Sequence, residues 1–254
     1  MQLKDKIIVV TGAASGIGRA MAHRFAEEQA KLVICADLNL SGARVAAAGI
    51  GGVAHECNVA KEGDIRHMIE LVEKAHGPID LFCSNAGIGV AGGAEVGNDA
   101  WQHIWDVNVM AHVYAARHMV PRMIARGGGY LLNTSSAAGL LSQIGSAPYA
   151  VTKHAAVGLA EWLAITHGDQ GIKVSVLCPQ AVKTAMTAGN PDGVASIDGM
   201  MEPEVLAEAV VRAIEAEDFL ILPHPEVLEY MRRKTADYNR WIGGMRKLNR
   251  KYRG

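Results

Sequence analysis

Short apolar runs alternate with longer helical patterns along nearly the whole chain of 254 residues. The runs are rich in β-branched residues and predict strands at 7–10, 32–36, 52–56, 81–84, 130–133, 173–177 and 219–222. The segments between them predict helices at 18–29, 41–47, 62–76, 101–126, 149–167 and 202–216. Because strands separated by helices pair in parallel through right-handed crossovers, we predict an α/β fold, a doubly wound seven-stranded parallel sheet with helices on both faces.

Length and apolar content fit a single domain over residues 1–254. The formal net charge is −1, so the chain lacks the basic field of a nucleic-acid-binding protein. Residues 231–254 nevertheless contain nine Lys and Arg and one acidic residue, which leaves 16 basic and 25 acidic residues, a balance of −9, in the first 230. A basic C-terminal extension, at about 224–254, is therefore expected to follow the folded body.

The cysteines lie in or beside apolar runs without a CxxC pair and are expected to be buried free thiols: Cys35, Cys57, Cys83 and Cys178. No signal peptide is recognisable, and no apolar run approaches the ~20 residues that span a bilayer, which predicts a cytoplasmic protein without a membrane span. The histidines form no HxxxH or HExxH pair, so no metal site is expected. Most, such as His103, His112 and His118, are expected to be solvated or to cap helices.

A glycine-rich turn, Thr11-Gly-Ala-Ala-Ser-Gly-Ile-Gly18, joins the first predicted strand to the first predicted helix. Glycines in that context let the backbone approach a pyrophosphate at a helix N-terminus. The candidate cofactor-binding residues of the turn are Gly12, Ser15, Gly16, Ile17 and Gly18. Taken alone, the turn could equally be a tight connection, and its spacing differs from GxGxxG.

Asp37 ends the second predicted strand, nineteen residues after Gly18, and Leu38 follows it. A carboxylate there can accept hydrogen bonds from the hydroxyls of an adenosine ribose and would repel a 2′-phosphate. Although Arg19 lies near in the sequence, Asp37 would face that group directly, so the pattern favours NAD over NADP. The alternative is that Asp37 is a helix N-cap or a turn residue in Asp-Leu-Asn, which would not explain its spacing from the glycines.

Tyr149 and Lys153 lie four residues apart on one predicted helix, with Ser136 thirteen residues upstream of the tyrosine. This spacing places a phenol and an ammonium group side by side. The ammonium would favour the phenolate and lower the tyrosine pKa from about 10 toward a range useful for general acid/base chemistry, and Ser136 could bond the same substrate oxygen. Taken alone, such a pair is more common on a solvated helix face.

Further landmarks follow in order, at Asn58-Val59, Asn85-Ala86-Gly87, Asn108 and Pro179 to Thr184, and with them the chain resembles the classical short-chain dehydrogenases/reductases over essentially its full length. The resemblance implies a Rossmann-type domain and a catalytic tetrad of Asn108, Ser136, Tyr149 and Lys153. It implies cofactor contacts, beyond the glycine turn, at Asp37, Leu38, Asn58, Val59, Asn85, Ala86, Gly87, Tyr149, Lys153, Pro179, Val182 and Thr184. Residues 85–87 would pass near the adenosine ribose, and Val182 with Thr184 would hold the nicotinamide carboxamide.

Three positions depart from the family's usual pattern. Asn58 stands where an aspartate commonly accepts a bond from the adenine amine, which an amide oxygen can also do. Ser84 replaces the first asparagine of Asn-Asn-Ala-Gly, and the replacement affects only a hydrogen bond that would support the backbone there. Gln180 replaces the glycine after Pro179, and its side chain is expected either to narrow the nicotinamide end or to contact substrate.

The resemblance implies an NAD-dependent short-chain alcohol dehydrogenase/ketoreductase that interconverts a hydrophobic secondary alcohol and its ketone by hydride transfer, with Tyr149 as general acid/base. Because the cellular NAD pool is mainly oxidised, alcohol oxidation is the expected direction. Two alternatives share the fold: an NADPH-dependent carbonyl reductase and a non-catalytic dinucleotide-binding or scaffolding protein, which would need no Tyr149. A serine hydrolase that uses Ser136 is a third, but the sequence lacks a nucleophile elbow.

Residues 137–141 and a loop at about 185–201 that contains Met186, Met200 and Met201 are apolar and are expected to form the substrate side of the site. The alternatives are that the loop is a plain surface connection and that the methionines fill the core. Helices 101–126 and 149–167 carry apolar residues on more than one side, which predicts a homodimer or homotetramer.

The C-terminal extension carries an apolar stripe. Its members are Met231, Tyr238, Met245 and Tyr252, seven apart, with Trp241 and Leu248 between them. This pattern predicts a basic amphipathic helix, interrupted at Gly243-Gly244, that docks on a neighbouring subunit. A solvated appendage and a contact with an anionic surface are the alternatives.

Overall fold

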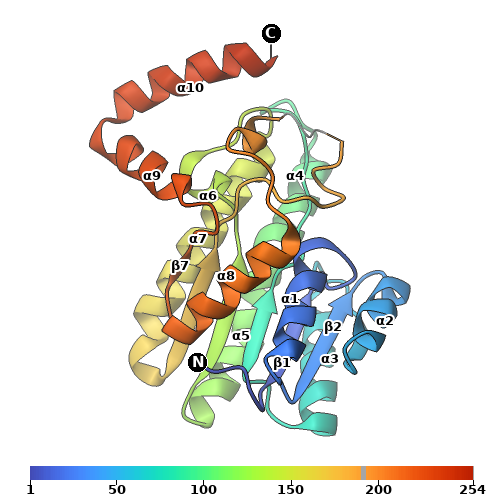
Figure 1. The fold of residues 1–254 in the computed structure, drawn as a ribbon. Coiled ribbons are helices and arrows are strands. Elements are labelled where there is room, and N and C mark those ends of the chain that lie inside the picture. Colours follow the sequence, from blue (N-terminus) through green and yellow to red (C-terminus); the bar gives the residue numbers. More distant parts are fainter. Residues whose placement is uncertain (190–192, 254) are drawn as a thin grey trace.

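Seven parallel strands form one sheet in the order β3-β2-β1-β4-β5-β6-β7. The computed structural model describes residues 1–189 and 193–253. The strands are β1 (Ile7–Thr11), β2 (Leu32–Asp37), β3 (Val53–Glu56), β4 (Leu81–Ser84), β5 (Gly129–Thr134), β6 (Ile172–Leu177) and β7 (Leu220–Ile221). The predicted doubly wound parallel sheet is confirmed, and Figure 1 shows helices on both of its sides.

Helices connect the strands and continue beyond the last one. They are α1 (Gly16–Glu27), α2 (Leu40–Ala48), α3 (Glu62–His76), α4 (Asn98–Trp105), α5 (Ala111–Ala125), α6 (Ala138–Leu141), α7 (Ala147–His167), α8 (Pro203–Ala216), α9 (Glu226–Ala236) and α10 (Tyr238–Arg253). Short helical turns also occur: η1 (Asp106–Met110) is π-helical, and η2 (Gly168–Gln170) and η3 (Val194–Ser196) are 3₁₀.

Each face of the sheet has its own hydrophobic core. One core packs residues of α3, α5 and α7 against the strands, and the other packs residues of α1, α2 and α8. All four cysteines are buried and free, as predicted. Within the described residues, no helix combines the length and apolarity needed to cross a bilayer, and no three His, Cys, Asp or Glu side chains gather as metal ligands would.

The predicted helix 101–126 is not regular. It consists of α4, the π-helical turn η1 and α5, and Asn108 lies in the middle of η1, fully buried. A π turn accommodates one extra residue and often occurs where a helix presents a functional side chain. Periodicity over so long a segment does not reveal such a turn, because the apolar pattern resumes after it.

The C-terminal extension forms two helices that meet at Asp237. This residue has an extended backbone, and its carboxylate accepts a hydrogen bond from the Arg240 backbone N–H at 2.9 Å, which caps the start of α10. The predicted interruption at Gly243-Gly244 is wrong, because α10 runs unbroken through both glycines. A glycine costs only about 1 kcal/mol relative to alanine inside a helix, which the cap and the flanking residues offset. Figure 1 shows α10 outside the layers that cover the sheet.

Candidate active site

The chain order of the strands reverses between β1 and β4, where a doubly wound sheet opens a crevice at its carboxyl edge. The glycine turn after β1 lies at this point. Gly12 and Gly16 have left-handed φ angles of 69° and 53°, which glycine adopts readily. A Cβ atom at Gly18 would lie 2.2 Å from the Gly12 carbonyl oxygen. The turn is therefore a cradle without side chains at the N-terminus of α1, which fits a pyrophosphate.

Thr11 fixes the loop after β4 against this turn. Its Oγ1 accepts hydrogen bonds from the backbone N–H groups of Asn85 at 2.9 Å and Ala86 at 3.2 Å. The Asn85 side chain donates to the Thr11 carbonyl at 3.0 Å and accepts from Thr134 at 3.1 Å. Strands β1, β4 and β5 thus hold this loop in place without help from an asparagine at position 84.

The Asp37 carboxylate is oriented at the end of β2. It accepts hydrogen bonds from the backbone N–H groups of Ala14 at 3.0 Å and Asn39 at 2.8 Å, and each oxygen keeps a lone pair for a ribose hydroxyl. Asn39, rather than Asp37, caps α2 by accepting from Gly42, which removes the N-cap alternative. Arg19 lies outside the cleft that contains Asp37.

Asn58 follows β3 and lines the same cleft. Its Oδ1 accepts from the backbone N–H of Ala60 at 3.1 Å, and its own backbone N–H donates to Asp64 at 3.1 Å. The amide oxygen expected to receive the adenine amine is thus already bonded once, with one lone pair left for a ligand.

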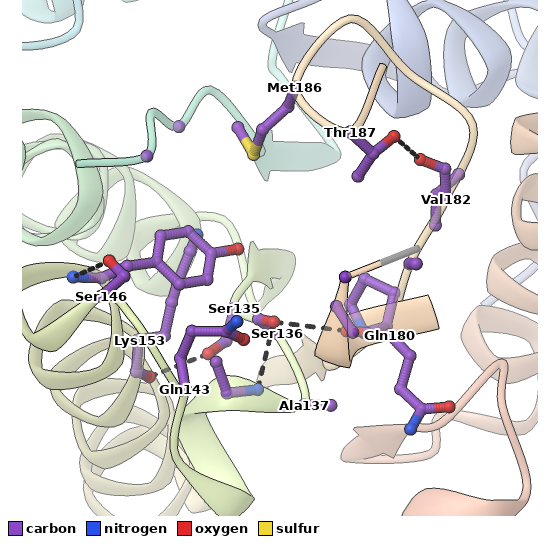
Figure 2. Close-up of a pocket in the computed structure, with 18 of the residues that line it drawn as sticks. Ser135, Ser136, Ala137, Gln143, Ser146, Lys153, Gln180, Val182, Met186 and Thr187 are labelled. Carbon is purple, nitrogen blue, oxygen red and sulfur yellow. Dashed lines mark hydrogen bonds between the residues drawn. The ribbon is translucent and has the colours of Figure 1, made fainter. Parts of the chain in front are cut away.

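Ser136, Tyr149 and Lys153 meet at the other end of the cleft, where Figure 2 shows Ser136 and Lys153. The Ser136 hydroxyl donates to the carbonyl of Pro179 at 3.3 Å. The Lys153 Nζ lies 5.6 Å from the centroid of the Tyr149 ring and donates to the Thr134 carbonyl at 3.0 Å. The phenol and the ammonium are therefore neighbours, as their spacing predicted, but the ammonium is tied to β5.

Helix α7 begins two residues earlier than predicted. Ser146 caps it by accepting a hydrogen bond from the backbone N–H of Tyr149 at 3.3 Å. The Ser146 hydroxyl also donates to the Val90 carbonyl at 2.5 Å. Tyr149 thus lies in the first turn of α7, which is tied to the loop after β4.

Asn108 lies behind the wall of the cleft. Its Oδ1 accepts from the backbone N–H of Ile88 at 2.9 Å, and its Nδ2 donates to the Ile88 carbonyl at 2.9 Å and to the Thr152 hydroxyl at 3.2 Å. A Cβ atom at Gly87 would lie 3.3 Å from Asn108 Oδ1 and 3.4 Å from Lys153 Nζ. The asparagine thus joins the loop after β4 to α7 next to the lysine.

Burial governs the protonation of Tyr149 and Lys153 in the protein alone. It lowers the pKa of Lys153 to about 8. It raises the pKa of Tyr149, while the neighbouring Ser136 hydroxyl acts in the opposite direction. The net shift of the Tyr149 pKa in the protein alone is therefore upward rather than downward as expected, because burial has the larger effect. A neutral phenol in this position can donate a proton.

The turn after β6 closes the cleft toward the glycine turn. The Thr187 hydroxyl donates to the Val182 carbonyl at 2.6 Å and accepts from the Thr184 backbone N–H at 3.1 Å (Figure 2). A Cβ atom at Gly16 would lie 3.0 Å from the Thr184 methyl carbon. The two residues expected at the nicotinamide therefore lie on one hydrogen-bonded turn next to the pyrophosphate cradle.

Gln180 lines the cleft, and its side-chain amide is held by a carboxylate of the protein. Its Nε2 donates to the Asp198 carboxylate at 3.0 Å, and Figure 2 shows its amide directed away from Ser136. The Tyr230 hydroxyl, on α9, contacts the same carboxylate at 2.9 and 3.1 Å. We call this arrangement the Asp198 bridge, because it links the start of the turn after β6, the end of the loop 185–201 and α9. Residues 190–192 of that predicted loop lie outside the described residues.

One cleft of about 2100 Å³ joins these groups. It exceeds the ~300–1,000 Å³ of a typical small-molecule site, which leaves room for a dinucleotide and a second ligand. Every cofactor and catalytic residue proposed from the sequence, except Asn108, lines it: Gly12, Ser15, Gly16, Ile17, Gly18, Asp37, Leu38, Asn58, Val59, Asn85, Ala86, Gly87, Ser136, Tyr149, Lys153, Pro179, Val182 and Thr184. The residues present therefore fit a nicotinamide dinucleotide.

The substrate side was predicted only in part. Leu141 and Met186 line the cleft, but Met200 and Met201 do not, and Met201 instead pairs with Val182 and packs toward the core. Residues of α10 line the cleft as well, although the sequence suggested that this helix docks on a neighbouring subunit: Arg240, Trp241, Gly244, Met245, Leu248, Lys251 and Tyr252.

His112 corrects the expectation that the histidines are solvated. It is 1% exposed, and its Nδ1 lies 2.8 Å from the Ser84 hydroxyl. Burial lowers the pKa of His112 to about 3, so the ring is neutral. Two departures from simple expectation, Ser84 and His112, thus form one buried hydrogen-bonded pair behind the active-site loop.

Comparison with known proteins agrees with this geometry. A family model described as short chain dehydrogenase matches residues 6–194. The chain belongs to the short-chain dehydrogenase family. This short-chain dehydrogenase is 31% identical over 194 residues to the cyclohexanol dehydrogenase of Acinetobacter sp. strain SE19, covering 74% of this chain and 77% of that protein. It is 31% identical over 229 residues to the meso-2,3-butanediol dehydrogenase of Serratia marcescens, covering 86% and 90%.

A solved structure extends the likeness to the fold. A short-chain dehydrogenase/reductase from Burkholderia phymatum, described as in complex with NAD, superposes with a TM-score of 0.86 at 27% identity, covering 94% of this chain and 96% of that one. The family consists of oxidoreductases that use a nicotinamide dinucleotide, in agreement with the glycine cradle and the Asp37 end of the cleft.

Proposed function

We propose that this short-chain dehydrogenase is an NAD-dependent oxidoreductase that interconverts a hydrophobic secondary alcohol and its ketone. The observation that carries the proposal is one continuous cleft with the Asp37 carboxylate at one end and Tyr149, Ser136 and Lys153 at the other. The relatives named for cyclohexanol and butanediol support an alcohol as the substrate class. The apolar side chains of Leu141 and Met186 support a hydrophobic one.

Tyr149 is the proposed proton-transfer residue. Its neutral phenol gives a proton to the carbonyl oxygen during reduction, and its phenolate takes the proton of the hydroxyl during oxidation. Ser136 holds the same substrate oxygen, and the Lys153 ammonium stabilises the phenolate that forms when the proton leaves. The bound nicotinamide supplies the hydride acceptor or donor. Asn108 positions the loop at Ile88 relative to Thr152, the neighbour of Lys153 in α7, through its three hydrogen bonds.

The charges that line the cleft favour NAD over NADP. Asp37 would repel a 2′-phosphate on the adenosine ribose. Among the described residues, the lysines and arginines that line the cleft belong to α7, α9 and α10: Lys153, Arg233, Arg240 and Lys251. None of these four cations belongs to the elements around Asp37, so none of them offsets the negative charge of its carboxylate. Because the cellular NAD pool is mainly oxidised, we propose alcohol oxidation as the physiological direction.

Asp37→Asn should narrow the preference for NAD over NADP. In the wild type we expect kcat/KM for NAD⁺ to exceed that for NADP⁺ by about tenfold or more, because charge repulsion disfavours the phosphate. The substitution removes the charge and keeps an acceptor oxygen, so the ratio should fall toward one. Initial rates of NADH or NADPH formation with cyclohexanol and 2,3-butanediol measure it.

Asp169→Asn is the matched control, because Asp169 is an exposed carboxylate in η2 outside the cleft. Its ratio should equal that of the wild type. A wild-type preference for NADP(H) would contradict the proposal and favour the NADPH-dependent carbonyl reductase. Dinucleotide binding without turnover across a broad panel of secondary alcohols would favour a non-catalytic binding or scaffolding protein instead.

The hydrolase alternative gains no support from the geometry. The Ser136 hydroxyl donates to a backbone carbonyl, and within residues 1–189 and 193–253 no histidine forms a hydrogen bond with it. A serine nucleophile needs a general base within hydrogen-bond distance of its hydroxyl group.

A homodimer or homotetramer in the cytoplasm is part of the same proposal. Helix α7 exposes three apolar side chains, Val151, Trp162 and Ile165, of which Ile165 is 84% exposed. Exposed apolar side chains on a long helix support a contact with a symmetry mate.

A further inference from the structure

Helix α10 presents a single apolar stripe to the cleft. Trp241, Met245, Leu248 and Tyr252 follow a 4-3-4 spacing, which places them on one face of the helix. All four are partly buried and line the cleft. Ile242, next to Trp241, is 52% exposed and lies outside the cleft. The side of the helix that faces the cleft therefore carries the apolar stripe, with Arg240 and Lys251 beside it, and Ile242 marks the outer side.

The start of this stripe adjoins the reactive end of the cleft. Trp241 packs on a small apolar cluster that includes Ala137 and Leu141. Ala137 is the N-cap of α6 and directly follows Ser136, and Leu141 is the last residue of that helix. Lys234 on α9 donates a hydrogen bond to the Leu140 carbonyl at 2.5 Å, which ties the C-terminal helices to α6. An apolar surface therefore continues from Ser136 along α6 to α10.

The Asp198 bridge holds this surface in position. Tyr230 belongs to the same apolar cluster as Trp241, and its hydroxyl contacts the Asp198 carboxylate that Gln180 also binds. Within the loop 185–201, the described residues, 185–189 with Met186 on the opposite side of the cleft from Ser136 (Figure 2) and 193–201 with Asp198, thus include a contact to α9. One carboxylate thus connects the described part of this loop to α9, which leads through Asp237 into α10.

We infer that α10 is the outer wall of the substrate half of the cleft and that its stripe selects secondary alcohols with a long apolar body over small ones. This inference rests on the proposed function. Each methylene group that the stripe removes from water adds binding energy, so a longer alcohol gains more from it than a short one. The stripe faces the cavity that contains Tyr149, which favours substrate over a partner subunit as its occupant.

Trp241→Ala tests the wall with 2-butanol and 2-decanol as substrates and NAD⁺ as cofactor. We define selectivity as kcat/KM for 2-decanol divided by kcat/KM for 2-butanol. The wild type should prefer 2-decanol, and Trp241→Ala should lower the selectivity by about tenfold. Ile242→Ala is the matched control, because it removes an apolar side chain of the same helix on the outer side, and its selectivity should equal that of the wild type.

Tyr230→Phe tests the bridge as a positioning contact. The variant keeps the aromatic ring in the apolar cluster and loses only the contact of its hydroxyl with Asp198. We expect KM for 2-decanol to rise about threefold while kcat for 2-butanol stays unchanged, because a hydrogen bond to an exposed carboxylate contributes modestly. A fall in kcat for both substrates would show a general structural role and contradict the positioning role.

Calorimetric titration with 2-decanone separates this inference from the proposed function. If the wild type binds 2-decanone but oxidises neither alcohol, the proposed function fails, and weaker binding by Trp241→Ala still supports the wall. If Trp241→Ala leaves both selectivity and 2-decanone binding unchanged, the inference is overturned. Light scattering measures the oligomeric mass of the same variant. A lower mass than that of the wild type, together with unchanged selectivity, would also overturn the inference and assign the stripe to a partner subunit.

Discussion

Replacing Tyr149 by phenylalanine should lower kcat by about 10²–10⁴-fold, the range that a positioned general acid or base contributes. The phenol lies in the cleft beside Ser136 and Lys153, whereas the other tyrosines that line the cleft among the described residues, Tyr230 and Tyr252, belong to α9 and α10. Dinucleotide binding should change little, because the Asp37 carboxylate and the glycine turn lie at the other end. NADH formation with cyclohexanol measures turnover, and fluorescence titration with NADH measures binding.

Tyr114→Phe is the control for this experiment. Tyr114 lies on α5, outside the cleft, where Arg117 lies over its ring at 5.6 Å. The control removes the same hydroxyl group from a different place and should retain wild-type kcat. Near-normal turnover by Tyr149→Phe on a confirmed substrate would exclude the tyrosine as the proton-transfer residue.

Gly18→Ala should weaken NADH binding by about tenfold or more. The new Cβ atom would lie 2.2 Å from the Gly12 carbonyl oxygen and 2.8 Å from the Asn85 side chain, so the turn must move. Overpacking of this kind costs about 1–3 kcal/mol, and here it displaces the backbone that forms the pyrophosphate cradle. The dissociation constant for NADH and the thermal midpoint of unfolding should both be measured, since both are expected to worsen.

Gly63→Ala provides the comparison. Gly63 lies in α3, and no atom comes within 4 Å of a Cβ atom placed there. Alanine is a better helix former than glycine, so this variant should bind NADH normally and unfold at an equal or higher temperature. Wild-type affinity for NADH in Gly18→Ala would mean that the dinucleotide lies elsewhere.

The sequence predicted the sheet because its signals are local. Each strand is a short β-branched run, and the helices between the strands leave only parallel pairing. Gly12 and Asp37 were found because they stand at the ends of predicted strands, and Tyr149 because of its spacing from Lys153 and the family resemblance. Their shared position in one cleft follows from the carboxyl edge of a parallel sheet.

Other features depend on contacts that no local pattern contains. The π turn around Asn108 is stabilised by bonds to Ile88 and Thr152, which lie 20 and 44 residues away. The direction of the Tyr149 pKa shift follows from burial rather than from its helical neighbour. The position of α10 depends on the direction in which the chain turns at Asp237. The sequence revealed the apolar stripe of this helix but did not indicate which surface the stripe contacts.

The way α10 is attached also bears on how this protein diverges from its relatives. The sheet and both large cores are complete by Leu222, and among helices and strands α10 makes its main contacts with α9. Amino-acid changes in residues 238–253 should therefore leave the folding of the rest of the chain intact. If α10 meets the substrate, evolution can alter which molecules are accepted through this one terminal segment while the chemistry at the sheet edge stays the same.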